Sequence, residues 1–140
     1  MRLLHRPADG ADRPADGPAD DRAALGERSA ADTRVLASRV AVADSPLARA
    51  RGLMFRRSVP ADYALVFPFD GADVRWLHML FVPFDIDAVW TVDGRVRRVE
   101  RLAAWTGLAR AEADLVVELP AGAAADVAPG DRIELRGEKG

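Results

Sequence analysis

Turn residues divide this sequence into short apolar runs that follow one another closely. The clearest turn is Asp93-Gly94, which separates two apolar runs and favours a tight hairpin of type I′. Connections this short leave no room for the long crossovers of a parallel sheet. We therefore expect an α+β, mostly β domain: a small curled antiparallel sheet or barrel of about seven short strands with one or two short helices. The predicted strands cover residues 34–43, 64–67, 74–79, 84–90, 96–102, 113–119 and 132–135.

Three local signals refine this expectation. Ser45 followed by Pro46 is typical of the cap and first turn of a short helix, and Gly52 favours its end. Residues 120–127, PAGAAADV, predict a second short helix or a turn. Within residues 96–102 the apolar side chains recur at every third position. That spacing fits neither a regular strand nor a helix, and it predicts a bulge or an early strand end.

Residues 1–32 differ in composition from the rest of the chain. The unit P-A-D begins at Pro7, Pro14 and Pro18, in a low-complexity segment without apolar periodicity. Such a segment cannot bury enough apolar surface to offset the entropy lost on ordering. The sequence therefore predicts a disordered tail over residues 1–32 and a single globular domain over residues 33–137.

Missing residue types exclude several kinds of chemistry. The 140 residues contain no Cys, Asn or Gln, and Lys139 is the only lysine. The chain therefore has no disulfide, no reactive thiolate, no cysteine zinc site and no buried lysine for a Schiff base. We expect no cofactor and no metal ion, because residues 33–140 also contain a single histidine, His78.

Charge and hydropathy limit the expected partners. Residues 33–140 hold fifteen basic and fifteen acidic side chains, so they offer no broad basic surface and we expect no nucleic-acid partner. No apolar stretch reaches the roughly 18–20 residues that span a bilayer, so we expect no membrane partner. The first ten residues lack the apolar segment of a signal peptide, and we expect a cytoplasmic protein. The oligomeric state stays open.

A pair of aspartates offers the clearest route to catalysis. Asp85 and Asp87 are two residues apart on a predicted strand, which would place both on one face with about 6–7 Å between their Cα atoms. Together with His78 they could support a carboxylate- or metal-dependent hydrolase. The favoured interpretation is simpler. This face of the strand is solvated, and the alternating apolar residues pack inward, namely Phe84, Ile86, Ala88 and Trp90.

Five blocks follow one another along the chain: RGLMFRRSVP, WLHMLFVPFDI, VDGRV, VVELPAG and PGDRIEL. With these blocks in this order, the chain resembles the prokaryotic family filed as domain of unknown function 192, over roughly residues 41–135. The resemblance implies a compact β-rich α+β domain and implies no activity. The central block departs from the family pattern: His78 stands where Lys is common, and Met79 where Asn is common.

These observations favour binding over catalysis. We expect a small-ligand-binding or accessory domain whose ligand is a sugar, a carboxylate or another small polar molecule. A structural or protein-interaction domain is the first alternative, and the hydrolase using Asp85, Asp87 and His78 is the second. The residues expected to line the pocket are Arg51, Trp76, His78, Asp85 and Trp105.

Overall fold

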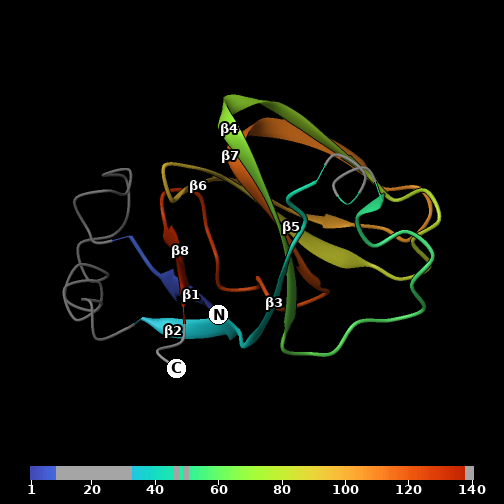
Figure 1. Ribbon diagram of the computed structural model, residues 1–140, viewed down its shortest axis with the longest axis horizontal. Coiled ribbons are helices and arrows are strands. Elements are labelled where there is room, and N and C mark those ends of the chain that lie inside the picture. Colours follow the sequence, from blue (N-terminus) through green and yellow to red (C-terminus); the bar gives the residue numbers. More distant parts are fainter. Residues whose placement is uncertain (9–32, 46–47, 49–50, 138–140) are drawn as a thin grey trace, which may run out of the picture.

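Eight strands of one sheet account for most of the described chain. The computed structural model describes residues 1–8, 33–45, 48 and 51–137 (Figure 1). Neighbouring strands follow the order β2-β1-β8-β6-β5-β7-β4-β3. The pairs are antiparallel except β3 with β4, which is parallel. The strands are β1 (Arg2–Arg6), β2 (Arg34–Ala37), β3 (Arg39–Val42), β4 (Tyr63–His78), β5 (Ile86–Val92), β6 (Arg95–Leu102), β7 (Leu108–Pro120) and β8 (Arg132–Arg136).

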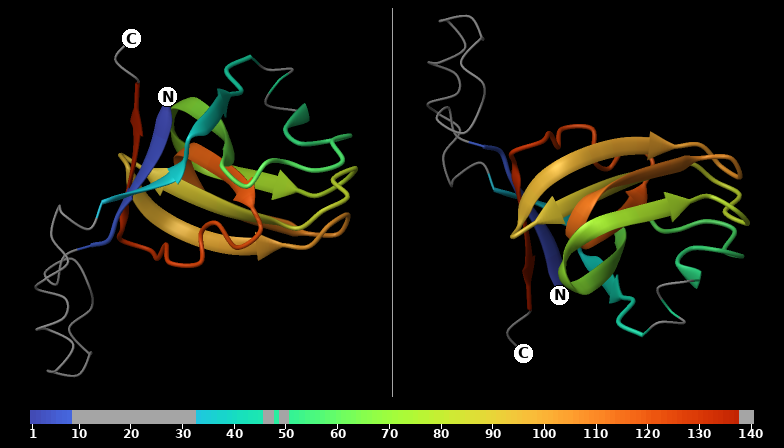
Figure 2. Two further views of the ribbon diagram at one scale, coloured as in Figure 1. Left: turned by 90° about the horizontal axis from the view of Figure 1, so that it is seen from below. Right: turned by 90° about the horizontal axis from the view of Figure 1, so that it is seen from above.

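The sheet is curled, and its two edge strands follow one another directly in the sequence. Strands β2 and β3 lie at opposite ends of the strand order, yet Ser38 alone separates them in sequence. The backbone N–H groups of Ser38 and Arg39 both donate to the carbonyl oxygen of Asp62, at 3.0 Å, just before β4. The strand order does not close into a complete barrel. A small, curled, mostly β domain is therefore confirmed, with less helix than expected (Figure 2).

Two apolar clusters lie on opposite faces of the central strands. Along β5, Trp90 belongs to one cluster and Val89 to the other, as strand alternation requires. We call the cluster that contains Trp90 the first core. The segment between β3 and β4 covers the first core with Leu53, and β1 covers the second with Leu3. All four side chains are at most 2% exposed, so both faces of the sheet are buried here.

The predicted hairpin and the predicted bulge are both present. Asp93 and Gly94 have φ of 51° and 79°, the left-handed values that a type I′ turn needs at its two central positions. In β6 the register passes from Arg98 opposite Trp90 to Val96 opposite Thr91, so Arg97 is the extra residue of a bulge. The irregular apolar spacing of residues 96–102 follows from this bulge.

Strand β4 is longer than expected. The sequence predicted two short strands separated by a loop over residues 68–73, but β4 runs without interruption from Tyr63 to His78. Its pairing with β7 shifts register between Pro68 and Asp73. A bulge therefore accommodates the Pro- and Gly-containing segment, and the ladder continues beyond it.

The predicted helix signals are present within the described residues. Ser45 Oγ accepts a hydrogen bond from Ala48 N at 3.1 Å, which is the expected cap. Gly52 N donates to the Ala48 carbonyl at 3.0 Å, and Gly52 has a left-handed φ of 51° at the expected stop. Residues 121–126 form successive turns. In the described part of the chain, no helix has the length and apolar character needed to cross a membrane.

The start of the chain differs from the sequence expectation. Residues 1–32 were predicted to be a tail, but Arg2–Arg6 form β1 between β2 and β8, with Leu3 and His5 buried. Five residues are too few for a strand to be read from their own pattern, because β1 depends on pairing with distant strands. The P-A-D segment from residue 9 to residue 32 lies outside the described residues, so disorder there stays a prediction.

A buried hydrogen bond between side chains connects β1 to the last turn of the chain. His5 Nε2 donates to Asp131 Oδ2 at 2.8 Å, while His5 Nδ1 accepts from Arg34 Nε at 3.3 Å. Asp131 also accepts hydrogen bonds from Ala8 N and Ala128 N, each at 2.9 Å. Burial acts to raise the pKa of Asp131, but the bonds from Ala8, His5 and Ala128 outweigh it and hold that pKa below its ordinary value.

Replacing this carboxylate should destabilise the fold. Asp131→Asn supplies one acceptor oxygen where two receive three donors, so we expect a loss of about 2–3 kcal/mol at neutral pH in urea unfolding. A lowered folded-state pKa contributes stability above the ordinary value of 3.8, and that stability is lost as the pH falls through the folded pKa. The difference in the free energy of unfolding between the wild type and Asp131→Asn should therefore become smaller at acidic pH.

Asp126→Asn is the matched control. Asp126 forms an exposed ion pair with Arg34 at 3.1 Å, so its loss should cost less than about 1 kcal/mol. Equal effects of the two substitutions would contradict the role given to Asp131.

Candidate functional site

A glutamate lies inside the sheet at the floor of a cavity. Glu118 is in β7, which pairs with β4 on one side and β5 on the other. Its neighbours Val117 and Leu119 belong to the second core, so alternation turns Glu118 toward the first core, as it does Val116. Glu118 is 6% exposed, and it contributes to the lining of a cavity on this side of the sheet.

The cavity above Glu118 holds about 190 Å³. Its walls come from the segment that follows the capped turn, from the last residues of β4 and from the loop between β4 and β5. Alternation along β4 turns Leu77 toward the first core, so Trp76 and His78 contribute from the strand's other face. The lining residues are Arg51, Gly52, Leu53, Met54, Trp76, Leu77, His78, Val82 and Glu118.

Gly52 lies close to the Glu118 carboxyl in a backbone conformation that favours glycine. Its left-handed φ of 51° disfavours any side chain. A Cβ atom there would make ordinary van der Waals contact, at 3.5 Å from Glu118 Oε1 and 3.4 Å from the Phe67 ring. The backbone conformation of the turn, and not a lack of space, therefore explains the glycine.

No protein group within the described residues bonds the Glu118 carboxyl. Among them it takes part in no hydrogen bond and no ion pair, which is uncommon for a carboxyl this deeply buried. Burial raises the pKa of Glu118 from 4.5 to about 8. The group is therefore mostly protonated at neutral pH and carries a proton that it can donate.

The structure brings together three of the five residues expected to form a pocket. Arg51, Trp76 and His78 contribute to the cavity lining. Asp85 does not: its Oδ1 accepts a hydrogen bond from Ala104 N at 2.8 Å and caps the loop between β6 and β7. Trp105 lies in that loop, 54% exposed, and its ring packs edge-on against another aromatic ring.

Sequence reasoning missed Glu118 and Gly52. Their signals were present: Glu118 interrupts the apolar run LVVEL, and a charged residue in a fully buried strand marks either a partner or a site. Gly52 was interpreted only as a helix stop. Both residues belong to blocks that carry the family resemblance, RGLMFRRSVP and VVELPAG, and the fold brings these two blocks into contact.

Asp87 is buried, whereas a solvated face was expected. Asp87 Oδ2 accepts hydrogen bonds from Gly122 N and Ala124 N at 2.9 Å, and Oδ1 accepts one from Arg101 Nε. The segment after β7 covers this face, which the local pattern of β5 could not reveal. Asp87 therefore holds a turn in place.

The hydrolase constellation is not assembled. Asp85 and Asp87 bind different loops, and His78 Nδ1 accepts from Leu80 N at 3.2 Å. Within the described residues, no cluster of three or more His, Asp or Glu side chains could hold a metal ion.

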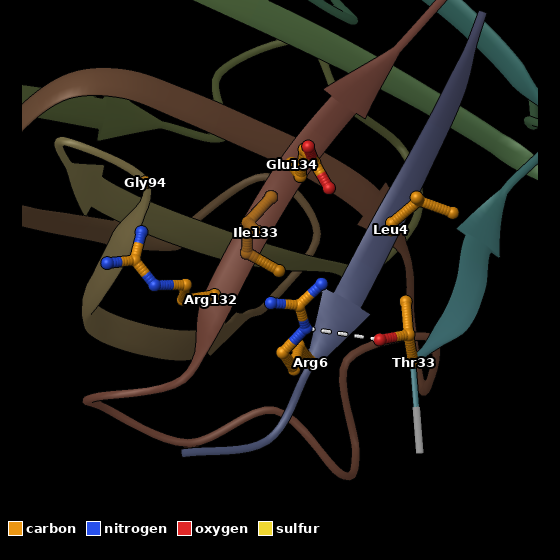
Figure 3. Close-up of a pocket in the computed structure, with 7 residues that line it drawn as sticks. All are labelled: Leu4, Arg6, Thr33, Gly94, Arg132, Ile133 and Glu134. Carbon is orange, nitrogen blue, oxygen red and sulfur yellow. Dashed lines mark hydrogen bonds between the residues drawn. The ribbon is translucent and has the colours of Figure 1, made fainter. Parts of the chain in front are cut away.

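A second hollow lies between β1, β8 and the β5–β6 hairpin (Figure 3). Arg6 and Arg132 face each other across the β1–β8 ladder there. Two of its charged side chains have protein partners: Arg6 Nε donates to Thr33 Oγ1 at 3.2 Å, and Glu134 accepts from Arg136 at 3.0 Å. The cavity over Glu118 is the stronger candidate. Its carboxyl, which has no partner among the described residues, belongs to a buried residue, whereas Arg132 is exposed to solvent.

Removing the buried carboxyl should change how stability depends on pH. The raised pKa means that the folded protein retains a proton which the unfolded chain releases between pH 4.5 and about 8. The stability of the wild type should therefore fall with rising pH, by up to about 1.4 kcal/mol per unit from this group. Glu118→Gln lacks this decline. Its free energy of unfolding, measured with urea, should therefore rise relative to that of the wild type from about pH 5 to about pH 8.

Glu134→Gln is the control for this prediction. Glu134 is exposed and pairs with Arg136, so the variant should follow the wild-type profile. A constant difference between Glu118→Gln and wild type across this range would show that Glu118 titrates normally.

Comparisons with known proteins place the chain. It matches a crystal structure of a protein of unknown function from Novosphingobium aromaticivorans with a TM-score of 0.69 and 20% identity, covering 96% of this chain and 84% of the other. It matches a candidate transcription regulator from Sinorhizobium meliloti with a TM-score of 0.66 and 22% identity, covering 95% and 92%. At these identities the two likenesses show a shared fold. No curated protein matches the chain.

The family comparison covers most of the chain. The model of the DUF192 family, described as an uncharacterized ACR, matches residues 28–135. The match includes the blocks that build the cavity, from Arg51 to Glu118. No activity is established for this family, and its description names none. The chain is a member of the DUF192 family.

Proposed function

We propose that this domain binds a small polar ligand in the cavity over Glu118. The observation that carries the proposal is the carboxyl of Glu118, a buried residue that is 6% exposed, because this carboxyl has no hydrogen-bond partner among the described residues. A buried polar group without a partner lowers stability, and an apolar residue of similar size would avoid that loss. Groups with strongly shifted pKa values inside cavities are common at functional sites.

The walls of the cavity define what the ligand must offer. Leu53, Leu77 and Val82 supply apolar surface, while Arg51 at the opening is exposed and forms no ion pair within the described residues. A ligand with a hydrogen-bond acceptor directed at protonated Glu118 and an anionic or strongly polar group near Arg51 would satisfy both. Small carboxylates and sugar acids have this character, in agreement with the ligand classes expected from the sequence.

Binding is a better fit than hydrolysis. The residues that line the cavity include one buried carboxyl and one histidine but no second carboxylate, nucleophile or metal site. The expected pair of Asp85 and Asp87 holds loops, as described above. The cytoplasmic location stays a prediction from the sequence.

A screen against the full chain tests the proposal. Small carboxylates, sugar acids, neutral sugars and amines would be tested by thermal shift. A ligand present at about a hundred times its dissociation constant should add about 2.7 kcal/mol and raise Tm by roughly 5–10 °C. Glu118→Leu removes the buried polar group and should melt above the wild type, yet show no shift with the same ligand.

Two further variants complete the design. Arg51→Ala should weaken binding without lowering stability, because Arg51 is exposed and makes no ion pair among the described residues. Glu134→Gln should respond to the ligand as the wild type does. An equal shift in Glu118→Leu and in wild type, or no shift with any compound, would contradict binding at this cavity.

A further inference from the structure

Three aromatic side chains project into solvent from three different segments. Phe55, Phe81 and Trp105 are 65%, 42% and 54% exposed. The rings of Phe55 and Phe81 stack with centroids 5.1 Å apart, and Trp105 meets Phe81 edge-on at 6.5 Å. We call this group the aromatic tip. Large aromatics are seldom gathered on a surface without a binding role, because each one alone would prefer burial.

The backbone presents these rings at a cost to stability. Phe55, Phe81 and Trp105 have left-handed φ values of 68°, 62° and 67°. Asp93 of the hairpin is the one other non-glycine residue with positive φ in the described part of the chain. Bulky residues rarely adopt this conformation, and strain of this kind gathers at functional sites.

Backbone hydrogen bonds connect the segments that carry the tip. Phe55 N donates to the Phe81 carbonyl at 2.8 Å, and Trp105 N donates to the Val82 carbonyl at 3.0 Å. Leu53, Met79 and Val82 lie buried beneath it, each at most 3% exposed. The segments are thus anchored to the first core and to one another, while the aromatic rings remain outside.

The arginines beside the tip have no acidic partners. Arg56 and Arg57 follow Phe55 directly, and the Arg56 guanidinium lies 5.1 Å from the centre of the Tyr63 ring. Within the described residues neither arginine forms an ion pair, nor does Arg51. The surface beside Phe55 is therefore both apolar and positive.

The tip occupies one end of the molecule. The loop after β4 and the loop after β6 lie side by side, away from the N- and C-termini, in both views of Figure 2. Exposed Leu80 and Leu108 extend the apolar surface beside them. Residues from separate loops at an end of a sheet form a projecting surface.

We propose that the aromatic tip and its flanking arginines dock this protein on an anionic phospholipid membrane. Aromatic and aliphatic side chains would enter the interface, and the unpaired arginines would meet the negative headgroups. This departs from the sequence analysis, which expected no membrane partner because no apolar stretch is long enough to span a bilayer. Docking at the membrane surface does not require such a stretch. The proposal is independent of the ligand proposed for the Glu118 cavity.

Vesicle binding by the full chain tests the proposal. Sedimentation with vesicles of phosphatidylcholine mixed with phosphatidylglycerol should recover the protein, and vesicles of phosphatidylcholine alone should recover at least roughly tenfold less. Salt should weaken the binding, because it screens the arginines. The fluorescence of exposed Trp105 should shift to shorter wavelength with the anionic vesicles. This is measured in Trp76→Phe, because Trp76 is also exposed, whereas Trp90 is buried and does not report on the surface.

The strained positions offer variants that keep the fold. Replacing Phe55, Phe81 and Trp105 together by Gly relieves the left-handed backbone, so the variant should not unfold for that reason, yet vesicle binding should fall at least roughly tenfold. Arg56→Ser with Arg57→Ser should also weaken binding. The controls are Val35→Ser, an exposed apolar residue of β2, and Arg136→Ser, an exposed arginine of β8.

Several results would overturn the proposal. These are no binding to either vesicle, equal binding to both, or unchanged binding in the folded triple glycine variant. A fourth is a wild-type dimer in analytical ultracentrifugation that the triple variant lacks, since the tip would then be covered by a second copy of the chain.

Discussion

Strand β7 imposes the constraint on which the site depends. It is paired along both edges, with β4 and with β5, so its register cannot shift without breaking two ladders. The same alternation that buries Val117 and Leu119 against the second core must turn Glu118 into the first. The carboxyl is thus held inside the protein by the apolar residues on either side of it, although its own burial is unfavourable.

The cavity and the aromatic tip share the segment that connects β3 with β4. Its capped turn ends at Gly52, which lies over Glu118, and Arg51 beside it contributes to the cavity lining. Three residues later Phe55 stacks on Phe81 at the surface. Buried Leu53, between them, fixes both parts to the first core. The two surfaces proposed to bind are therefore positioned by one short anchored segment and by the loops that meet it.

Local signals allowed the sequence to predict the general fold but not its long-range pairing. The Asp93-Gly94 turn, the Ser45 cap and the bulge in β6 depend on neighbouring residues, and each was predicted. Strand β1 and the continuity of β4 depend on distant partners, and neither was. The candidate site also divides into a part visible in the local sequence and a part that depends on distant contacts. Arg51, Trp76 and His78 were predicted because they are unusual residues within the blocks that resemble the family. Glu118 acquires its character from packing against Gly52 and Leu65, far away in sequence.

The central claim is that Glu118 is a protonated, buried carboxyl within the cavity, and its titration tests that most directly. The full chain would be labelled with ¹³C at the glutamate carboxyl carbons, and the Glu118 resonance would be assigned by its absence from Glu118→Gln. The account predicts a midpoint at about 8 for this resonance, well above the other glutamates. A midpoint near the ordinary 4.5 would show a carboxyl that is solvated or paired, and would contradict the account.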